Sequence, residues 1–105
     1  MIALFDVDGT ISERDGHLRP GVRNMLRVLD ALGVDVYLWS ARGRAHANAI
    51  ADRNHLVVVE CFTKPDARPI TYDAMRRACG GLAPNLVVDN EYDERVQDCL
   101  FVRVW

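Results

Sequence analysis

Short apolar runs recur along the chain, and polar or turn-forming residues bound each of them. The runs Ile2–Asp6, Val34–Trp39, Leu56–Val59 and Leu86–Asp89 have the length and composition of buried strands, and Phe101–Trp105 predicts a final strand. Longer amphipathic segments separate these runs. Because strands that alternate with helices form parallel sheets, the pattern predicts a parallel sheet with right-handed crossovers.

The segments between the strands carry helical spacing. Pro20 is placed as an early helix residue, apolar residues recur every three or four positions after it, and Gly33 ends the helix. Further helices are expected over Arg44–Arg53, Thr71–Cys79 and Asp93–Cys99. The pattern as a whole predicts an α/β fold: a single Rossmann-like, three-layer domain over residues 1–105, with a parallel sheet of about five strands.

Composition narrows the class of protein. The chain has 105 residues, half of them hydrophobic, which is enough for one small domain with a real core. Its formal net charge is −2 and its Lys and Arg residues are scattered, so there is no basic stripe for bulk nucleic-acid binding and no acidic tail.

Cysteine usage and hydropathy bear on the compartment. Cys61, Cys79 and Cys99 are odd in number and far apart, with no CxxC or Cys/His spacing for zinc. They are typical of reduced, buried thiols in an intracellular, cytoplasmic protein, and a catalytic cysteine would need a partnering base. Asp6 interrupts the opening apolar run too early for a signal peptide, and no stretch approaches a membrane span.

Polar residues follow three of the predicted strands directly. Asp6 and Asp8 end the first, Ser40 ends the second and Asp89 ends the strand at Leu86–Asp89. The carboxyl ends of parallel strands meet at the edge where open α/β sheets bind ligands. Residues i and i+2 of a strand point to one side, so Asp6 and Asp8 could face one ligand. Two anions that close favour either a bound metal or a proton-sharing pair.

Four short motifs occur in order along the chain. The first, DxDGT, is Asp6-Val7-Asp8-Gly9-Thr10, and the second, an apolar strand ending in a hydroxyl, is Val36-Tyr37-Leu38-Trp39-Ser40. The third, a Lys before Pro, is Lys64-Pro65, and the fourth, an apolar strand ending in Asp with another acid nearby, is Val87-Val88-Asp89-Asn90-Glu91-Tyr92-Asp93. In this order and spacing they resemble the motifs of the haloacid dehalogenase (HAD) superfamily of phosphotransferases, and the resemblance covers essentially the whole chain.

The resemblance implies a reaction and a metal. Asp6 would be the nucleophile that becomes an aspartyl-phosphate, and Asp8 the general acid and base. Mg²⁺ would be held by the Asp6 carboxylate, the Asp8 backbone carbonyl and Asp89. Physical chemistry supports these roles: a carboxylate that attacks a dianionic phosphate meets charge repulsion, which a hard cation relieves. A covalent intermediate also divides one difficult displacement into two easier ones.

The same resemblance implies the phosphate ligands. Ser40 and Lys64 would bind the phosphoryl oxygens, with help from Thr10 and backbone amides. Each has a plainer alternative: Thr10 as a cap of a turn, Ser40 as the N-cap of the next helix, and Lys64 as a surface lysine. Arg42 could bind a substrate phosphate through its guanidinium fork, or could be a solvated residue at the start of a helix.

The fourth motif departs from the family at one position. Asn90 stands where many members have a second acid next to Asp89, which bears on the outer shell of the metal. Asp93 is either an orienter of metal-bound water or the N-cap acid of the last helix, and the sequence leaves both open.

The spacing between motifs leaves no room for a cap domain. The polar segment Ser12–Arg19 predicts an exposed loop or small hairpin, and Ile11–Leu18 would form only a short flap. A capless site would be open to phosphates on bulky substrates such as polynucleotide ends or phosphoproteins, and equally to small phosphorylated molecules. A neighbouring subunit could supply a lid, which makes a homo-oligomer an alternative.

The sequence therefore predicts a Mg²⁺-dependent phosphomonoester hydrolase, a HAD-type phosphatase. A signalling receiver domain also combines acids, a hydroxyl and a Lys, but there the accepting Asp ends the third strand, which the order of motifs does not match. A catalytically silent phosphate-binding module of the same fold is the other alternative. Hydrolysis and transfer to an acceptor other than water both fit these residues.

Overall fold

Five parallel strands form the central sheet of the protein. The computed structural model describes residues 1–66, 70–90 and 100–103. The strands lie in the order β3-β2-β1-β4-β5, and every neighbouring pair is parallel. Their bounds are β1 Ile2–Asp6, β2 Asp35–Ser40, β3 Glu60–Thr63, β4 Leu86–Asp89 and β5 Leu100–Arg103. This architecture confirms the predicted Rossmann-like α/β fold.

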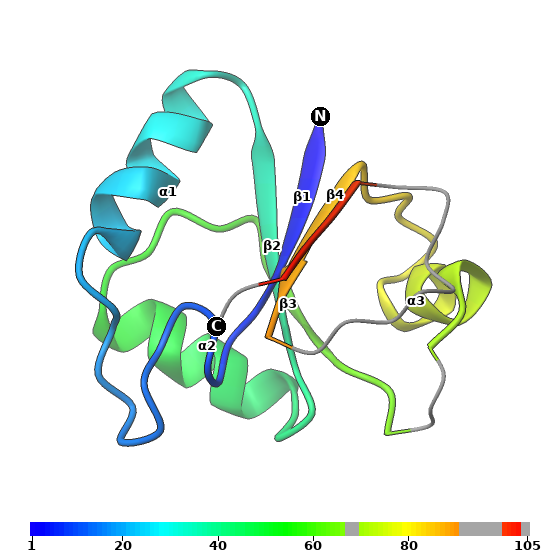
Figure 1. The fold of residues 1–105 in the computed structure, drawn as a ribbon, viewed down its shortest axis with the longest axis horizontal. Helices are drawn as coiled ribbons and strands as arrows, with labels where there is room; N and C mark the ends of the chain where they lie inside the picture. Colours follow the sequence, from blue (N-terminus) through cyan, green and yellow to red (C-terminus); the bar gives the residue numbers. More distant parts are fainter. Residues whose placement is uncertain (67–69, 91–99, 104–105) are drawn as a thin grey trace.

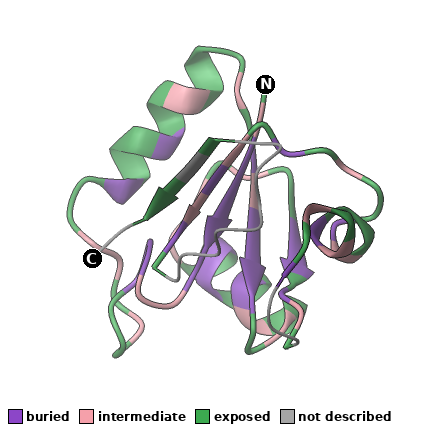
Figure 2. Ribbon diagram, turned by 45° about the vertical axis from the view of Figure 1, so that its right-hand side comes forward, coloured by how far each residue is buried: buried purple, intermediate pink, exposed green. Residues whose placement is uncertain are grey.

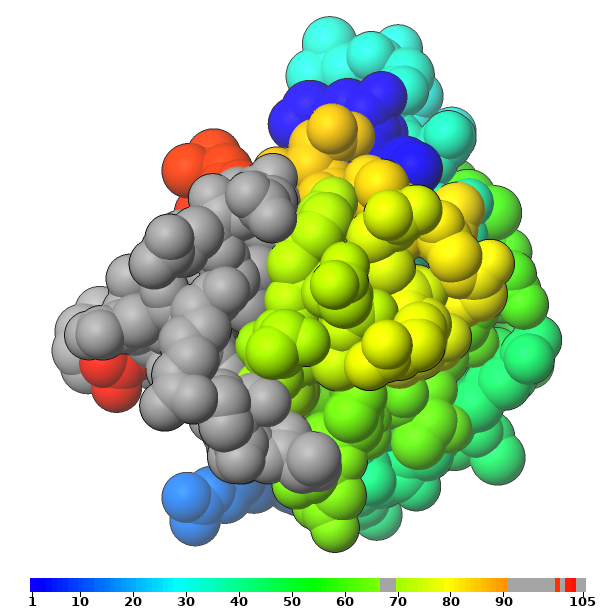
Figure 3. Space-filling model, turned by 90° about the vertical axis from the view of Figure 1, so that its right-hand side faces the viewer, coloured from blue at the N-terminus to red at the C-terminus, as the bar shows by residue number. Residues whose placement is uncertain are grey.

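Helices cover both faces of the sheet, as the three-layer prediction requires. Helix α1 (Val22–Ala31) and helix α2 (Arg44–Arg53) lie on one face, and helix α3 (Tyr72–Ala78) lies on the other (Figure 1). Figure 3 views the α3 face, where α3 and the loops that flank it occupy the middle of the surface. The sheet is therefore the middle layer. Its strands β1 and β2 are largely buried, whereas the edge strand β5 is exposed at Leu100 and Val102 (Figure 2).

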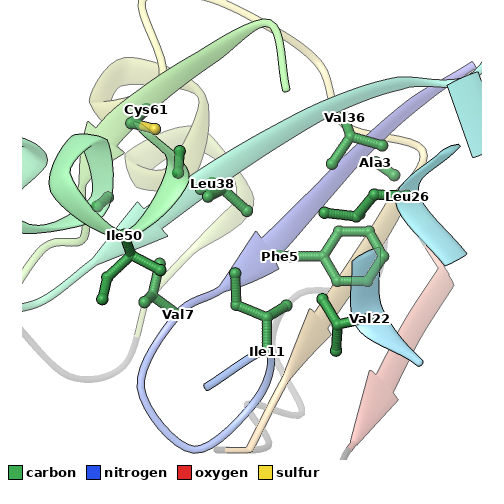
Figure 4. Close-up of a cluster of buried hydrophobic side chains, with 12 residues drawn as sticks. Ala3, Phe5, Val7, Ile11, Val22, Leu26, Val36, Leu38, Ile50 and Cys61 are labelled. Atoms are coloured by element: carbon green, nitrogen blue, oxygen red, sulfur yellow. The ribbon is translucent and has the colours of Figure 1, made fainter. Parts of the chain in front are cut away.

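Alternation along the strands divides the core into two clusters. Ala3 and Phe5 of β1 point toward α1 and α2, whereas Leu4 between them points toward α3. Figure 4 shows the first cluster, in which Phe5 lies beside Val22 and Leu26 of α1. Because β1 is buried on both faces, it reads as a continuous apolar run in the sequence.

The third strand differs from the prediction. It was expected at Leu56–Val59, but β3 begins at Glu60 and ends at Thr63. Val59 donates its N–H to the carbonyl of Val36, the second residue of β2, so the chain reaches a pairing partner only there. Leu56–Val59 is the approach to the sheet, in which Leu56 and Val58 are partly buried and Val57 and Val59 are exposed. The shift places Lys64 directly after a strand.

Other element boundaries agree with the prediction more closely. Helix α1 begins after its N-cap Gly21, so Pro20 precedes the helix instead of lying in its first turn. Gly33 follows the helix with φ +79°, a conformation that glycine adopts without strain. The last strand, β5, begins at Leu100, one residue earlier than predicted, and the end expected at Trp105 lies outside the described residues. The helix expected at Asp93–Cys99 lies outside the described residues.

The segment predicted as a flap is anchored at its start. Ile11 and Ser12 are buried, and Ser12 pairs with Leu18 in a short antiparallel bridge, so the exposed part is limited to the turn between them. Residues 1–66, which are described without a gap, contain no inserted domain between the first three motifs. Within the described part of the chain, no helix is long and apolar enough to cross a membrane.

Candidate active site at the carboxyl edge of the sheet

Four strands deliver polar residues to one edge of the sheet. Asp6 is the last residue of β1, Ser40 of β2 and Asp89 of β4, while Lys64 follows β3 immediately. Ser40 pairs with Thr63, and the backbone N–H of Lys64 donates to the carbonyl of Ser40 at 2.9 Å. The ladder between β2 and β3 thus continues into the site and fixes where Lys64 stands.

Asp6, Lys64 and Asp89 form a buried charged group. The Lys64 ammonium donates to Asp89 Oδ2 at 2.7 Å and lies 3.8 Å from Asp6 Oδ1. The side chains of Asp6, Lys64 and Asp89 are only 8%, 5% and 2% exposed. Lys64 Nζ also lies 5.5 Å from the centre of the Trp39 ring, whose face attracts a cation. A buried ammonium between two carboxylates is costly unless all three are held in place.

Asp6 carries the perturbed charge of this group. Burial, followed by the negative charge of Asp89, raises the pKa of the Asp6 carboxyl from 3.8 to about 7, although Lys64 and Thr10 lower it. Asp8 adds a smaller upward effect. The pocket around Asp6 therefore favours additional positive charge, either as a proton or as a cation.

The loop after β1 supports Asp6. Thr10 Oγ1 donates to Asp6 Oδ2 at 3.3 Å, and Thr10 itself is buried. Gly9 has φ +82°, and a Cβ at this position would collide with the side chain of Asn90. Because of this close approach, the loop after β1 and the loop after β4 pack against each other. Asn90, the position that departs from the family pattern, thus contacts the DxDGT loop.

Asp8 lies outside β1 and contacts a different set of residues. Its Oδ2 accepts a hydrogen bond from Ser40 Oγ at 3.2 Å, and its Oδ1 lies 3.0 Å from His46 Nε2 and 3.5 Å from an Arg42 nitrogen. The Asp8 side chain is one-third exposed. Ser40 and His46 belong to the α2 side of the sheet, whereas Asp6 shares the α3 side with Leu4.

The plainer alternative for Ser40, a role as N-cap of the following helix, is wrong. The N-cap of α2 is Gly43, and Ser40 Oγ instead accepts the N–H of Arg42 at 3.1 Å while donating to Asp8. Arg42 is placed at the rim of the site, 63% exposed. Arg44 points elsewhere and pairs with Glu60 at 2.9 Å.

His46 is the site residue that sequence reasoning missed. The three histidines lack metal-ligand spacing, which led to no role for any of them. His46 lies in the first turn of α2, six residues after Ser40, and this turn faces the carboxyl edge of the sheet. The signal available in the sequence was its place at the start of the helix that follows a motif strand.

The donor atoms at this edge suit a hard cation. Carboxylate oxygens are the ligands that Mg²⁺ prefers, and the raised pKa of Asp6 shows that positive charge is favoured beside it. Among the described residues, no three His, Cys, Asp or Glu side chains stand close enough to form a ready cluster. Asp6 and Asp89 are instead bridged by the Lys64 ammonium. The carboxylates of Asp6 and Asp89 are therefore the two side chains at this edge that could hold a hard cation.

The described cysteines do not contribute to this edge. Cys61 and Cys79 are free, buried thiols, and burial raises the pKa of Cys61 to about 11 and that of Cys79 to about 12. A thiol with so high a pKa is a poor nucleophile near neutral pH. Cys99, like Asp93, lies outside the described residues.

Comparison with known proteins gives structural neighbours only. No protein-family model matches the chain, and no curated protein matches it. Solved structures do match. A chain of a Pnkp1/Rnl/Hen1 complex aligns with a TM-score of 0.67 at 16% identity over 98% of this chain, and a chain of a Pnkp1/Rnl/Hen1 RNA repair complex aligns with a TM-score of 0.68 at 13% identity over 98%. DsGPDH of Dunaliella salina aligns with a TM-score of 0.61 at 26% identity over 87%.

The matched regions are parts of longer chains. This chain spans 45% and 42% of the two repair-complex chains and 20% of DsGPDH. At the low identity of the two repair-complex chains the similarity establishes the fold alone, so a function must be argued from the residues at the sheet edge.

Proposed function

We propose that this chain is a Mg²⁺-dependent phosphomonoester hydrolase of the HAD type, with Asp6 as the nucleophile. The observation that carries the proposal is the meeting of Asp6, Lys64 and Asp89 in one buried group, although they come from three strands far apart in the sequence. Similarity to parts of RNA repair complexes agrees with a role in phosphate or nucleic-acid chemistry.

The reaction divides into two displacements on phosphorus. In the first, Asp6 forms an oxygen–phosphorus bond, the bond to the leaving oxygen breaks, and Asp8 gives that oxygen a proton. In the second, water attacks the aspartyl-phosphate, Asp8 takes a proton from the water, and the bond from phosphorus to Asp6 breaks. Bound Mg²⁺, held by Asp6, Asp89 and the Asp8 carbonyl, would neutralise charge between the carboxylate and the phosphoryl group.

The positions of the two acids match these two tasks. Asp6 is buried beside the Lys64 ammonium, which can also stabilise the negative charge spread over the phosphoryl oxygens. Asp8 is one-third exposed, within reach of both water and a leaving group. Thr10 and Ser40 are the hydroxyls proposed for the phosphoryl oxygens, and each already contacts one of the acids.

An open site favours phosphates carried on large molecules. The short segment after β1 is tied to the core through Ile11 and Ser12, so little of it can fold over a substrate. Arg42, exposed at the rim, is suited to a flanking phosphate. We therefore place polynucleotide ends and other bulky phosphate esters ahead of small metabolites. A lid from a second copy of the chain remains the alternative design.

The structure gives the receiver-domain hypothesis no support. The third strand ends in Thr63 followed by Lys64, whereas a receiver would carry its accepting Asp there. The retained acids and Lys64 likewise favour an enzyme over a silent binding module.

Hydrolysis of an aryl phosphate tests the proposal directly. We expect turnover by the wild type with Mg²⁺, none with EDTA, and none for Asp6→Asn. Asp15→Asn is the matched control, because Asp15 is exposed and its carboxylate contacts the neighbouring His17, away from the candidate site. Activity that survives Asp6→Asn would overturn the nucleophile, and absence of turnover on any phosphoester would favour the binding module. A panel of nucleotides, phosphorylated metabolites and 3′-phosphorylated oligonucleotides would then rank the substrates.

A further inference from the structure

The contact between His46 and Asp8 has no part in the mechanism derived so far. His46 Nε2 lies 3.0 Å from Asp8 Oδ1, and the two residues are 38 positions apart in the sequence. The His46 side chain is 19% exposed, so most of it is enclosed by protein. A partly buried contact between distant residues is held by the fold and not by chain proximity.

Helix α2 makes His46 a firm support. Ala47, Ile50 and Ala51 of the same helix are buried in the core beneath it. A group carried by a packed helix is placed more accurately than one on an exposed loop. Asp8, by contrast, lies after the end of β1, and its side chain depends on neighbours for its orientation.

The partners of Asp8 divide between its two oxygens. Ser40 Oγ donates to Oδ2, and His46 faces Oδ1. An ionised carboxylate only accepts hydrogen bonds, so His46 must present Nε2–H. Arg42 also approaches Oδ1, but at 3.5 Å and from an exposed position. His46 is therefore the better-placed group on that oxygen.

We propose that His46 is a positioning residue that holds Asp8 for proton transfer, an inference that rests on the proposed phosphatase function. In the first displacement Asp8 gives its proton to the leaving oxygen, which departs with the electron pair of the broken bond. Asp8 is then a carboxylate, and the Nε2–H of His46 stabilises that form and keeps it aimed at the site. When water attacks, the carboxylate takes one proton from it and the acid is restored.

Leaving-group dependence separates this role from a merely structural one. A poor leaving group such as an alkoxide needs the proton from Asp8, whereas p-nitrophenolate leaves without much help. We expect His46→Leu to lower kcat/KM, which reports the steps up to release of the leaving group, by about 10- to 100-fold on an alkyl phosphate and by no more than about threefold on p-nitrophenyl phosphate. His46→Gln keeps an N–H donor and should restore most of the loss.

His17→Leu is the matched control. His17 also contacts an aspartate, Asp15, at 2.8 Å, but that pair is exposed on the turn after Ser12. The variant His17→Leu should leave the activity on both phosphates unchanged. A second readout does not depend on turnover: the ¹⁵N signal of the His46 ring should shift in Asp8→Ala, while that of His17 should not. An unchanged His46 signal would show that the contact is absent in solution.

The outcomes distinguish the two proposals. Wild-type protein without turnover on either phosphate overturns the phosphatase function, and this role with it. Wild-type turnover combined with equal losses of kcat/KM on both phosphates, or with no loss of kcat/KM, overturns the role of His46 alone.

Discussion

Asp6 and Asp8 stand two residues apart in the sequence, yet they occupy contrasting environments. Asp6 ends a central strand, is buried against Lys64 and Asp89, and has its pKa raised to about 7. Asp8 is one-third exposed, and its partners Ser40 and His46 come from the α2 side of the sheet. One short motif thus places two chemically identical groups in two different surroundings.

The difference follows from where β1 ends, and on the proposed mechanism it suits the two acids to different roles. Strand pairing fixes Asp6 in a buried pocket, where a nucleophile can be kept near a cation and away from water. The carboxylate of Asp8, beyond the end of β1, is held by the side chains of Ser40 and His46 and stays in reach of solvent. Environments that separate two carboxylates in this way are what acid and base roles require.

Replacing each carboxylate by an amide should lower turnover to different degrees. Asp6→Asn should lower kcat by about 10⁴-fold or more, because no covalent intermediate can form. Asp8→Asn should lower it by about 10²- to 10⁴-fold, the range for a general acid and base. Steady-state rates on an aryl phosphate with Mg²⁺ measure both. Equal losses would remove the distinction between the two roles.

Removing the cation beside Asp6 should lower the stability of the fold much more than removing the cation near Asp8. Lys64→Met leaves Asp6 and Asp89 buried without the ammonium, and should lower the free energy of unfolding by about 3–5 kcal/mol. Urea unfolding without divalent ions measures this. The double variant Lys64→Met/Asp89→Asn should recover much of the loss. A loss below about 1 kcal/mol for Lys64→Met would mean that the buried group is weakly coupled.

The raised pKa of Asp6 predicts a dependence of stability on pH. The folded state holds this proton more tightly than the unfolded chain, where the pKa is 3.8. The stabilisation is therefore present below pH 4 and is lost as the pH rises to about 7. The Asp6→Asn side chain cannot ionise, so the variant does not lose this stabilisation. Between pH 4 and pH 8, the free energy of unfolding of the variant should therefore rise relative to that of the wild type by about a few kcal/mol. Parallel urea titrations in EDTA would show it, and a constant difference would contradict it.

The smallest effect on stability is expected from the exposed residue Arg42, which lies near Asp8. Arg42→Met removes a cation near Asp8 that is 63% exposed, and should change the free energy of unfolding by no more than about 1 kcal/mol. Its effect should appear in KM for a phosphorylated oligonucleotide, with KM for a small aryl phosphate nearly unchanged. If both KM values rise together, Arg42 binds the reacting phosphate itself.

Much of the fold follows from the apolar pattern. The strands at Ile2–Asp6 and Leu86–Asp89 are buried on both faces, so their runs are continuous and unambiguous. The third strand was placed wrongly because Leu56–Val59 looks more like a strand than Glu60–Thr63, which has polar residues at both ends. Pairing with β2 decides where β3 begins, and that partner is not visible in the local sequence.

The site was predicted as a set of positions but not as a set of contacts. Strand ends brought Asp6, Ser40 and Asp89 to one edge, as expected for a parallel sheet. The bridging place of Lys64 and the contact of His46 with Asp8 depend on helix orientation and side-chain reach. Such contacts are set by tertiary packing, and no spacing rule along the chain expresses them.

The backbone bond from Lys64 to the Ser40 carbonyl carries a consequence for assembly. The backbone hydrogen bonds between β2 and β3 continue to Lys64. Pairing of these two strands therefore also brings the Lys64 ammonium to the carboxylates of Asp6 and Asp89. A slip of one rung would deliver Thr63 or Pro65 in place of the lysine. On the proposed mechanism, a molecule in which β3 is not paired with β2 would therefore be inactive. Pairing of β3 would complete the site without a further step.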